Sequence, residues 1–129
     1  MLVMIQDVAV INHGPIGCSA DFAEFNFTNR AEQIRRNLPL KNVKLLSTNL
    51  QEKDMIYGGE AKLKEAIRDA YVRFRPKAIF VTASCASGII GDDVSGITDE
   101  LEKELGTPVV YVSCEGFKSQ IWATGFDSA

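Results

Sequence analysis

Four short apolar segments lie along the chain. In each, apolar side chains follow one another instead of alternating with polar ones. Such runs are typical of strands that are covered on both faces, as in a parallel sheet. The pattern therefore predicts four buried strands: Val8–Ile11, Val43–Leu46, Ala78–Ala83 and Val109–Val112.

The segment between the second and third strands has the period of an amphipathic helix. Over residues 59–75 the apolar side chains recur at i, i+3 and i+4, so they form one stripe along a helix. Pro76 ends this helix, because the residue before a proline is driven out of the helical conformation. The stripe consists of Leu63, Ala66, Ile67, Ala70, Tyr71 and Phe74.

A second helix is predicted between the third and fourth strands. Asp92 and Asp93 bring negative charge to its N-terminus, and Gly106 suits the position just after its C-terminus. Residues 18–37 are also predicted to be helical in part. Strands that alternate with helices form right-handed crossovers. The predicted fold class is α/β: an open, mainly parallel sheet with helices on both faces, in the three-layer Rossmann-like or flavodoxin-like arrangement. No linker or repeat divides the chain, so residues 1–129 are predicted to form a single domain.

The composition excludes several classes of function. With 14 Lys and Arg against 17 Asp and Glu, the net charge is −3, so the chain lacks the basic face of a sequence-independent nucleic-acid binder. No apolar run reaches the roughly 18 residues of a membrane span. No basic segment precedes the apolar N-terminus as in a signal peptide. We therefore expect a cytoplasmic protein that binds neither nucleic acid nor a membrane.

The three cysteines follow three of the predicted strands. Cys18, Cys85 and Cys114 are odd in number and form no CxxC pair, which is unlike a secreted disulfide framework. Ligands of open parallel sheets bind at the carboxyl edge, where all three cysteines are expected. Thiolates that converge on glycine-rich loops suit an iron–sulfur cluster, although a typical cluster needs four ligands. The alternative is that each cysteine is a small buried apolar residue.

The histidine and several glycines on the same edge each have two possible roles. His13 is the only histidine, and it is either a residue of the cluster surroundings or a core residue. Gly14, Gly17 and Gly88 belong either to loops around a cluster or to ordinary turns. A Cys18–His13 hydrolase is disfavoured because residues five apart on one tight loop rarely align as nucleophile and base. No dinucleotide or P-loop motif is present.

Four motifs together resemble the first α/β domain of the nitrogenase component 1 superfamily, and most closely its α-type subunit. They are INHGPIGC (11–18), NLQEKDMIYGG (49–59), CASGIIGDD (85–93) and CEGF (114–117). The resemblance implies that Cys18 and Cys85 are ligands of an iron–sulfur cluster of the P-cluster type and that Cys114 is structural. A further ligand of the family falls before Met1, so the chain resembles a domain excised from a longer subunit.

The resemblance also implies partners. A homologous β-type subunit would complete the cluster, and an ATP-dependent iron protein would dock on Ile56, Tyr57 and Ile90. His13, Gly14, Gly17 and Gly88 would belong to the loops that surround the cluster. No catalytic residue is expected in this chain, because the ligands of the catalytic metal cofactor come from later domains of the family. Alone, the chain is expected to hold no intact cluster and to be inactive.

Two segments depart from the molybdenum–iron pattern, namely residues 19–39 and residues 118–129. The branch of the superfamily, and with it the substrate, therefore stays open. The leading hypothesis is an oxidoreductase domain that helps to pass electrons from the iron protein to a catalytic metal cofactor. The alternatives are a cofactor-assembly scaffold of the same superfamily and a non-catalytic flavodoxin-like binding domain with buried cysteines.

Overall fold

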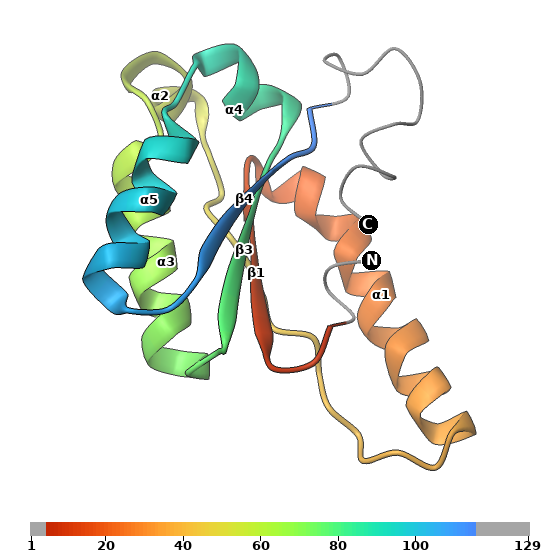
Figure 1. The fold of residues 1–129 in the computed structure, drawn as a ribbon. Coiled ribbons are helices and arrows are strands. Elements are labelled where there is room, and N and C mark those ends of the chain that lie inside the picture. Colours follow the sequence, from red (N-terminus) through yellow and green to blue (C-terminus); the bar gives the residue numbers. More distant parts are fainter. Residues whose placement is uncertain (1–4, 116–129) are drawn as a thin grey trace.

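The computed structural model of the chain describes residues 5–115, and for residues 21–23 and 25 it describes the backbone only. Strands and helices alternate along the chain, as the hydrophobic pattern predicts (Figure 1). In chain order the elements are β1 (Val8–His13), α1 (Ile16–Arg35), β2 (Leu45–Ser47), α2 (Glu52–Tyr57), α3 (Glu60–Phe74), β3 (Ala78–Ala83), α4 (Cys85–Ile90), α5 (Val94–Leu105) and β4 (Val109–Ser113).

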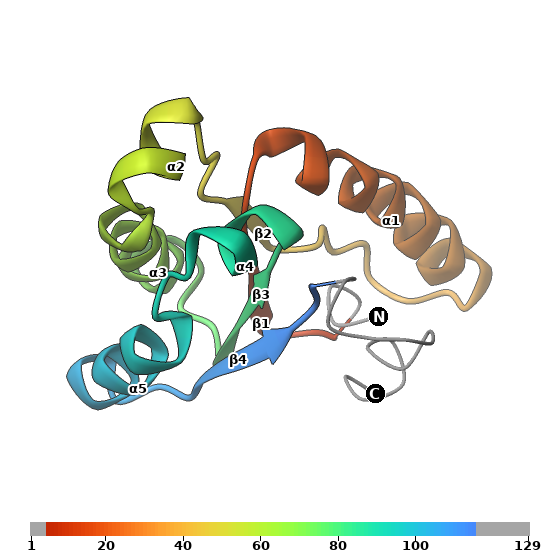
Figure 2. The same ribbon diagram turned by 90° about the horizontal axis from the view of Figure 1, so that it is seen from above.

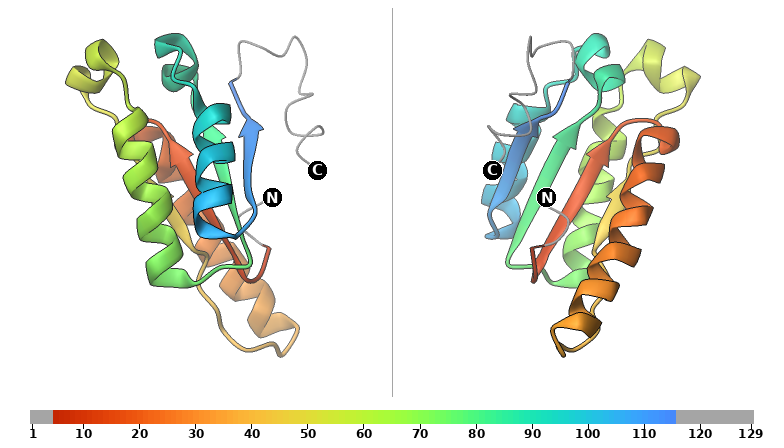
Figure 3. Two further views of the ribbon diagram at one scale, coloured as in Figure 1. Left: turned by 60° about the vertical axis from the view of Figure 1, so that its left-hand side comes forward. Right: turned by 90° about the vertical axis from the view of Figure 1, so that its right-hand side faces the viewer.

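The four strands form one parallel sheet in the order β2-β1-β3-β4. In its register Ile11 lies opposite Leu46 on one side and Val81 on the other. Helices cover both faces: α3 and α5 lie side by side on one face and α1 lies on the other (Figure 2). The two views of Figure 3 show the same layers from the side. The predicted three-layer α/β fold is confirmed.

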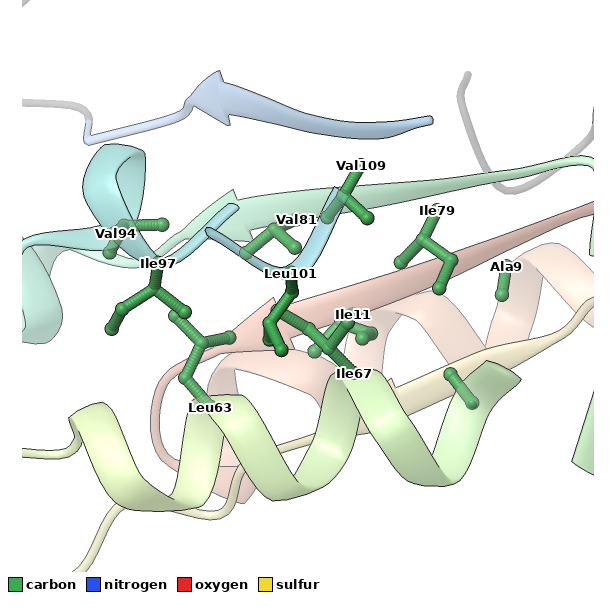
Figure 4. Packing of buried hydrophobic residues seen from close by; sticks show 11 residues of the cluster. Ala9, Ile11, Leu63, Ile67, Ile79, Val81, Val94, Ile97, Leu101 and Val109 are labelled. Atoms are coloured by element: carbon green, nitrogen blue, oxygen red, sulfur yellow. The ribbon is translucent and has the colours of Figure 1, made fainter. Parts of the chain in front are cut away.

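The main core lies between the sheet and the α3/α5 layer (Figure 4). Alternate residues of β1, β3 and β4 face this layer, because side chains of a strand point to opposite faces in turn. The predicted stripe of α3 supplies Leu63, Ile67 and Ala70, all fully buried. The strands and α5 contribute Ala9, Ile11, Ile79, Val81, Val94, Ile97, Leu101 and Val109.

Helices α3 and α5 are also joined at the surface by two ion pairs. Lys64 Nζ lies 2.7 Å from Glu100 Oε2, and Arg68 donates two hydrogen bonds to Glu104 at 2.7 and 2.8 Å. In both pairs the partners are 36 residues apart in the sequence, because α3 and α5 run parallel to each other. Each such exposed pair stabilises the fold by less than about 1 kcal/mol.

The ends of α3 and α5 agree with the sequence. Helix α3 ends at Phe74, and Arg75 then adopts a left-handed conformation (φ 44°) directly before Pro76. Gly106 follows α5 in the same left-handed region (φ 64°), which glycine tolerates without strain. Asp93 caps α5 by accepting a hydrogen bond from the Gly96 N–H at 2.9 Å.

The main differences between the structure and the predicted elements are three. Strand β1 continues two residues past Ile11, because its pairing with β3 extends through His13. Strand β2 begins at Leu45, since the Val43 N–H is taken by the Asn26 side chain of α1. Two six-residue helices, α2 and α4, occupy segments for which no helix was predicted. None of the helices within residues 5–115 combines the length and the apolar character needed to cross a bilayer.

Candidate functional site

The candidate site is the carboxyl edge of the sheet, where the segments leaving β1, β2 and β3 meet. Seen from above in Figure 2, the start of α1 and the helices α2 and α4 surround this edge. The β1 and β3 segments approach each other closely: the Ser84 N–H donates to the His13 carbonyl at 3.0 Å. A Cβ added at Gly14 would overlap the side chain of Ser84, so only glycine allows this approach.

Cys18 and Cys85 lie on these two neighbouring segments. Cys18 is in the first turn of α1, after β1, and Cys85 is the first residue of α4, after β3. Both are exposed and neither forms a disulfide, so the alternative of buried structural cysteines does not describe them. The structure therefore brings both predicted ligands to one edge of the sheet, on adjacent strands.

A buried polar cluster anchors the turn that carries Cys18. The next residue, Ser19, is buried and accepts a hydrogen bond of 2.7 Å from the Asn12 amide group of β1. Asn12 Oδ1 in turn accepts a hydrogen bond of 3.3 Å from the Thr82 hydroxyl of β3. Because all three side chains are buried, replacing one leaves its partner without a hydrogen bond. The first turn of α1 is thus tied to both central strands.

His13 lies on the opposite face of β1 and is fully buried. Its Nδ1 lies 3.1 Å from Thr48 Oγ1, and its Nε2 lies 3.0 Å from Asp92 Oδ2. Thr48 Oγ1 also accepts a hydrogen bond of 3.1 Å from the Gly14 N–H. Both ring nitrogens are therefore engaged within the protein, and neither is left to bind a metal ion.

One protonation state satisfies every group of this network. The neutral imidazole with a proton on Nε2 donates to the Asp92 carboxylate and accepts at Nδ1 from the Thr48 hydroxyl, which itself accepts from Gly14. Burial lowers the pKa of His13 below its usual value of 6.5, and the opposing effect of Asp92 is the smaller one. The neutral form is therefore the one that the fold favours.

Asp92 joins this network to helix α2. Its two carboxylate oxygens accept the N–H of Gly59, between α2 and α3, at 3.1 and 3.0 Å. A Cβ added at Gly59 would lie 2.5 Å from Leu50 Cδ2 and 3.0 Å from His13 Cε1. The sequence placed Asp92 and Gly59 only at the starts of two helices; their role depends on contacts with residues distant in sequence.

Helices α2 and α4 pack against each other above the sheet (Figure 1). Both expose apolar side chains. Ile56 and Tyr57 of α2 are 77% and 87% exposed, and Ile89 of α4 is 78% exposed. We call these three residues the α2/α4 surface. The expectation that Tyr57 is exposed is confirmed, while Ile90 is half-buried and its neighbour Ile89 faces solvent. Large exposed apolar side chains that gather in one place are typical of interaction sites.

A salt bridge fixes helix α2 on α3. Lys62 Nζ lies 2.6 Å from Asp54 Oδ2 and 3.3 Å from the Asn49 carbonyl oxygen. Asp54 also accepts a hydrogen bond of 2.8 Å from the Gln51 N–H, which completes a capping box at the start of α2. The hydrogen bond from Lys62, and then the one from Gln51, lower the pKa of Asp54.

The remaining predicted residues are less constrained. A Cβ at Gly17 would meet no atom within 4 Å, and Gly88 is half-buried inside α4. Gly88 lines a cavity of about 230 Å³ together with Asp92 and the buried Glu115. Glu115 accepts hydrogen bonds from Tyr111 and Ser113. Gly116 and Phe117 of the CEGF motif, and the departing segment 118–129, lie outside the described residues.

Cys114 follows β4 and differs from the other two cysteines. The residue is exposed, yet desolvation of its sulfur and the adjacent Glu115 carboxylate raise the pKa of the Cys114 thiol. A raised pKa disfavours the thiolate form that binds metals. That Cys114 is not a ligand stays a prediction.

Within residues 5–115 no group of three or more His, Cys, Asp or Glu side chains is arranged to hold a metal ion. Cys18 and Cys85 fit an iron–sulfur centre by their chemistry and their exposure at one edge, but they supply only part of a ligand set.

Comparison with known proteins gives the family. The sequence model of nitrogenase component 1 type oxidoreductases matches residues 1–129, the whole of this chain. The chain therefore belongs to the nitrogenase component 1 type oxidoreductase family.

Individual relatives include two kinds of protein. The nitrogenase molybdenum-iron protein alpha chain of Clostridium pasteurianum is 41% identical over 94% of this chain and 22% of its own length. The nitrogenase iron-molybdenum cofactor biosynthesis protein NifE of Methanococcus maripaludis is 39% identical over 92% of this chain and 23% of its own length. The chain thus spans about a quarter of the curated relatives it matches.

A solved structure agrees with the fold. The structure described as "Nitrogenase Cp1 at pH 5" has a TM-score of 0.74 and 38% identity, over 95% of this chain and 25% of that one.

Proposed function

We propose that this chain is the domain of a nitrogenase-like oxidoreductase subunit that helps to hold an iron–sulfur centre of the P-cluster type. In this proposal Cys18 and Cys85 are ligands, and residues outside the chain complete the set. The centre would carry electrons from an iron-protein reductase toward a catalytic metal cofactor. The single observation that supports the proposal most is that two exposed, unpaired cysteines leave adjacent strands at one edge of the sheet.

The residues of this chain would hold the two cysteine segments in place beside each other. The Asn12–Ser19 hydrogen bond restrains the turn that carries Cys18, and the close approach of Gly14 to Ser84 keeps the two cysteine segments adjacent. A homologous β-type subunit is proposed to cover this edge and supply the other ligands. Backbone N–H groups near the sulfurs and the exclusion of water at the subunit interface would tune the potential of the centre.

The α2/α4 surface is proposed as the docking site of the ATP-dependent iron protein. Its support is the exposure of Ile56, Tyr57 and Ile89 on two short helices beside the cysteine segments. Ile90, which was expected to belong to this surface, is half-buried and would support it from beneath.

The decisive experiment uses the full-length subunit that contains this domain, purified without oxygen together with its β-type partner. Iron content and visible absorbance are measured for the parent and for Cys18→Ala, Cys85→Ala and Cys114→Ala. We expect either of the first two substitutions to remove the cluster signal and Cys114→Ala, the matched control, to retain it. A full iron content in Cys18→Ala would overturn the ligand assignment.

This chain alone is proposed to hold no stoichiometric cluster and to have no reductase activity, because two of its residues cannot complete a cubane. Anaerobic reconstitution with iron and sulfide tests this directly. A stable cluster that disappears in Cys18→Ala would contradict the claim that the chain is incomplete, while it would support the ligand assignment.

A cofactor-assembly scaffold is the second candidate function. It is favoured by the near-equal identity to a molybdenum-iron protein alpha chain and to NifE, 41% and 39%. The two functions differ in whether the assembled complex reduces substrate with an iron protein and ATP. Sustained substrate reduction favours the first function, and transfer of a metal cofactor to an acceptor protein without reduction favours the second. The family match disfavours the third alternative, an unrelated flavodoxin-like binding domain.

A further inference from the structure

A continuous hydrogen-bonded chain connects the α2/α4 surface with the loop that carries Cys18. It runs from the N–H of Gly59, which lies two residues after α2 and caps the start of α3, to the carboxylate of Asp92, two residues after α4. Asp92 then contacts His13 Nε2, and His13 Nδ1 contacts Thr48, which accepts from the Gly14 N–H. Each link lies between 3.0 and 3.1 Å.

Asp92 lies between α4 and α5 and contacts the segment that follows α2. Gly91 ends α4 in a left-handed conformation (φ 81°), and Asp92 follows at once, with a carboxylate that is 3% exposed. Because the same carboxylate accepts the Gly59 N–H, one side chain joins the residue after α4 to the short segment between α2 and α3. A displacement of either segment would act on the hydrogen bond that Asp92 forms with His13.

The other end of the hydrogen-bonded chain is Gly14, in the segment between β1 and Cys18, which we call the Cys18 loop. His13 and Gly14 are followed directly by Pro15 and by α1, whose first turn contains Cys18. The Gly14 carbonyl also accepts the Leu50 N–H at 3.0 Å, so the loop is fixed by the segment before α2 as well. The packing is tight throughout, since no Cβ fits at Gly59 between Leu50 and His13.

We infer that His13 is a positioning residue that couples the α2/α4 surface to the Cys18 loop through Asp92. A protein that binds the surface and shifts α2 or α4 acts on the loop through this buried chain. The inference rests on the proposed function only for what binds at each end. The mechanical link itself is a property of these residues, because buried polar groups resist separation from their partners.

The test is amide hydrogen exchange of this chain followed by NMR, with perturbation at one end and measurement at the other. In Asp92→Asn the carboxylate at the surface end is lost while its size is retained. We expect the Gly14 and Cys18 N–H groups to exchange about tenfold faster, relative to the amides of β3, which report global unfolding. The matched control is Asp93→Asn, which makes the same change of charge at the neighbouring residue, where Asn can still cap α5, and breaks no hydrogen bond of the network. It should change both amides by less than about twofold.

Two substitutions of His13 give a second, independent arm. The amide of His13→Gln reaches the place of Nε2 and should retain the contact with Asp92, whereas the shorter His13→Asn reaches only the Thr48 side. We expect His13→Asn to speed the exchange of the Gly59 N–H about tenfold and His13→Gln to restore it. This pair decides the matter if Asp92→Asn does not fold.

Unchanged rates at Gly14 and Cys18 in Asp92→Asn, with a faster Gly59 N–H, would overturn the inference, because the chain would then end at Asp92. An equal effect of Asp93→Asn would overturn it as well, since general loosening would explain the result. No cluster and no partner protein enter this experiment. Its failure would leave the ligand assignment of Cys18 and Cys85 intact, and a failed cluster assay would leave the exchange result intact.

Discussion

The α3/α5 layer and the carboxyl edge are built on opposite rules. Between α3, α5 and the sheet, every residue of the core cluster is apolar, and charged residues form ion pairs at the solvent side (Figure 4). At the carboxyl edge the arrangement is reversed: His13, Thr48 and Asp92 form hydrogen bonds inside, while Ile56, Tyr57 and Ile89 face solvent. The difference separates the region that stabilises the fold from the region suited to recognition.

The largest effect is expected in the apolar layer. Leu101 is fully buried between α5 and the core, and Leu101→Ala removes apolar contacts and leaves a cavity. We expect the free energy of unfolding to fall by about 3 kcal/mol, measured by urea denaturation followed by circular dichroism. A loss below about 1 kcal/mol would mean that the layer is not the main source of stability.

A smaller loss is expected from the polar network. Asp92→Ala leaves the His13 Nε2–H and the Gly59 N–H buried without an acceptor. We expect a destabilisation of about 2 kcal/mol in the same urea assay. Asp93→Ala serves as the neighbouring control and should cost about 1 kcal/mol, the usual value for a lost helix cap. Equal losses at the two positions would contradict the special role of Asp92.

The pH dependence of stability separates the two regions, because the carboxyl edge contains the titratable His13 and the core of the α3/α5 layer contains only apolar residues. Burial lowers the pKa of His13 below 6.5, so the unfolded chain binds a proton more readily than the folded one. Stability from the neutral His13 is therefore fully present above pH 6.5 and is lost as the pH falls below it. Urea midpoints measured across this range should decline for the parent chain and decline less for His13→Gln. Equal declines in both would show that His13 is not the responsible group.

The smallest effect on stability is expected at the α2/α4 surface. Tyr57 is 87% exposed, so Tyr57→Ala should change the free energy of unfolding by less than about 0.5 kcal/mol. In the full-length subunit the same substitution should weaken binding of the iron protein, measured by titration calorimetry. Unchanged binding with unchanged stability would remove the surface from the proposed function.

The hydrophobic pattern was sufficient for the four strands, whose apolar side chains form continuous runs, and for α3, whose apolar stripe extends over several turns. It failed for α2 and α4, because six residues hold less than two turns and Gly88 interrupts one of them. It also stopped β1 too early, since Asn12 and His13 are polar yet continue the strand through hydrogen bonds to distant residues.

Some features of the candidate site could likewise be predicted from the sequence, and others could not. The position of Cys18 and Cys85 at one edge follows from the parallel direction of the strands, which the sequence predicts, whereas the structure gives the order that makes β1 and β3 neighbours. That Ile89 and not Ile90 faces solvent depends on the orientation of a short helix, and no periodic signal reports it. Asp92 was found beside His13 only through the fold, because 79 residues separate them in the chain.

The two ion pairs between α3 and α5 have a consequence for alignment that exceeds their energy. Lys64 with Glu100 and Arg68 with Glu104 are one helical turn apart on both helices, so they fit together only in one register. If α5 slid along α3 by one turn, about 5.4 Å, one pair would lose its partner and the other would change it. Asp92, just before α5, would move by the same step and leave the reach of His13. The exposed ion pairs therefore favour the register of α5 along α3 in which the buried carboxylate of Asp92 reaches His13.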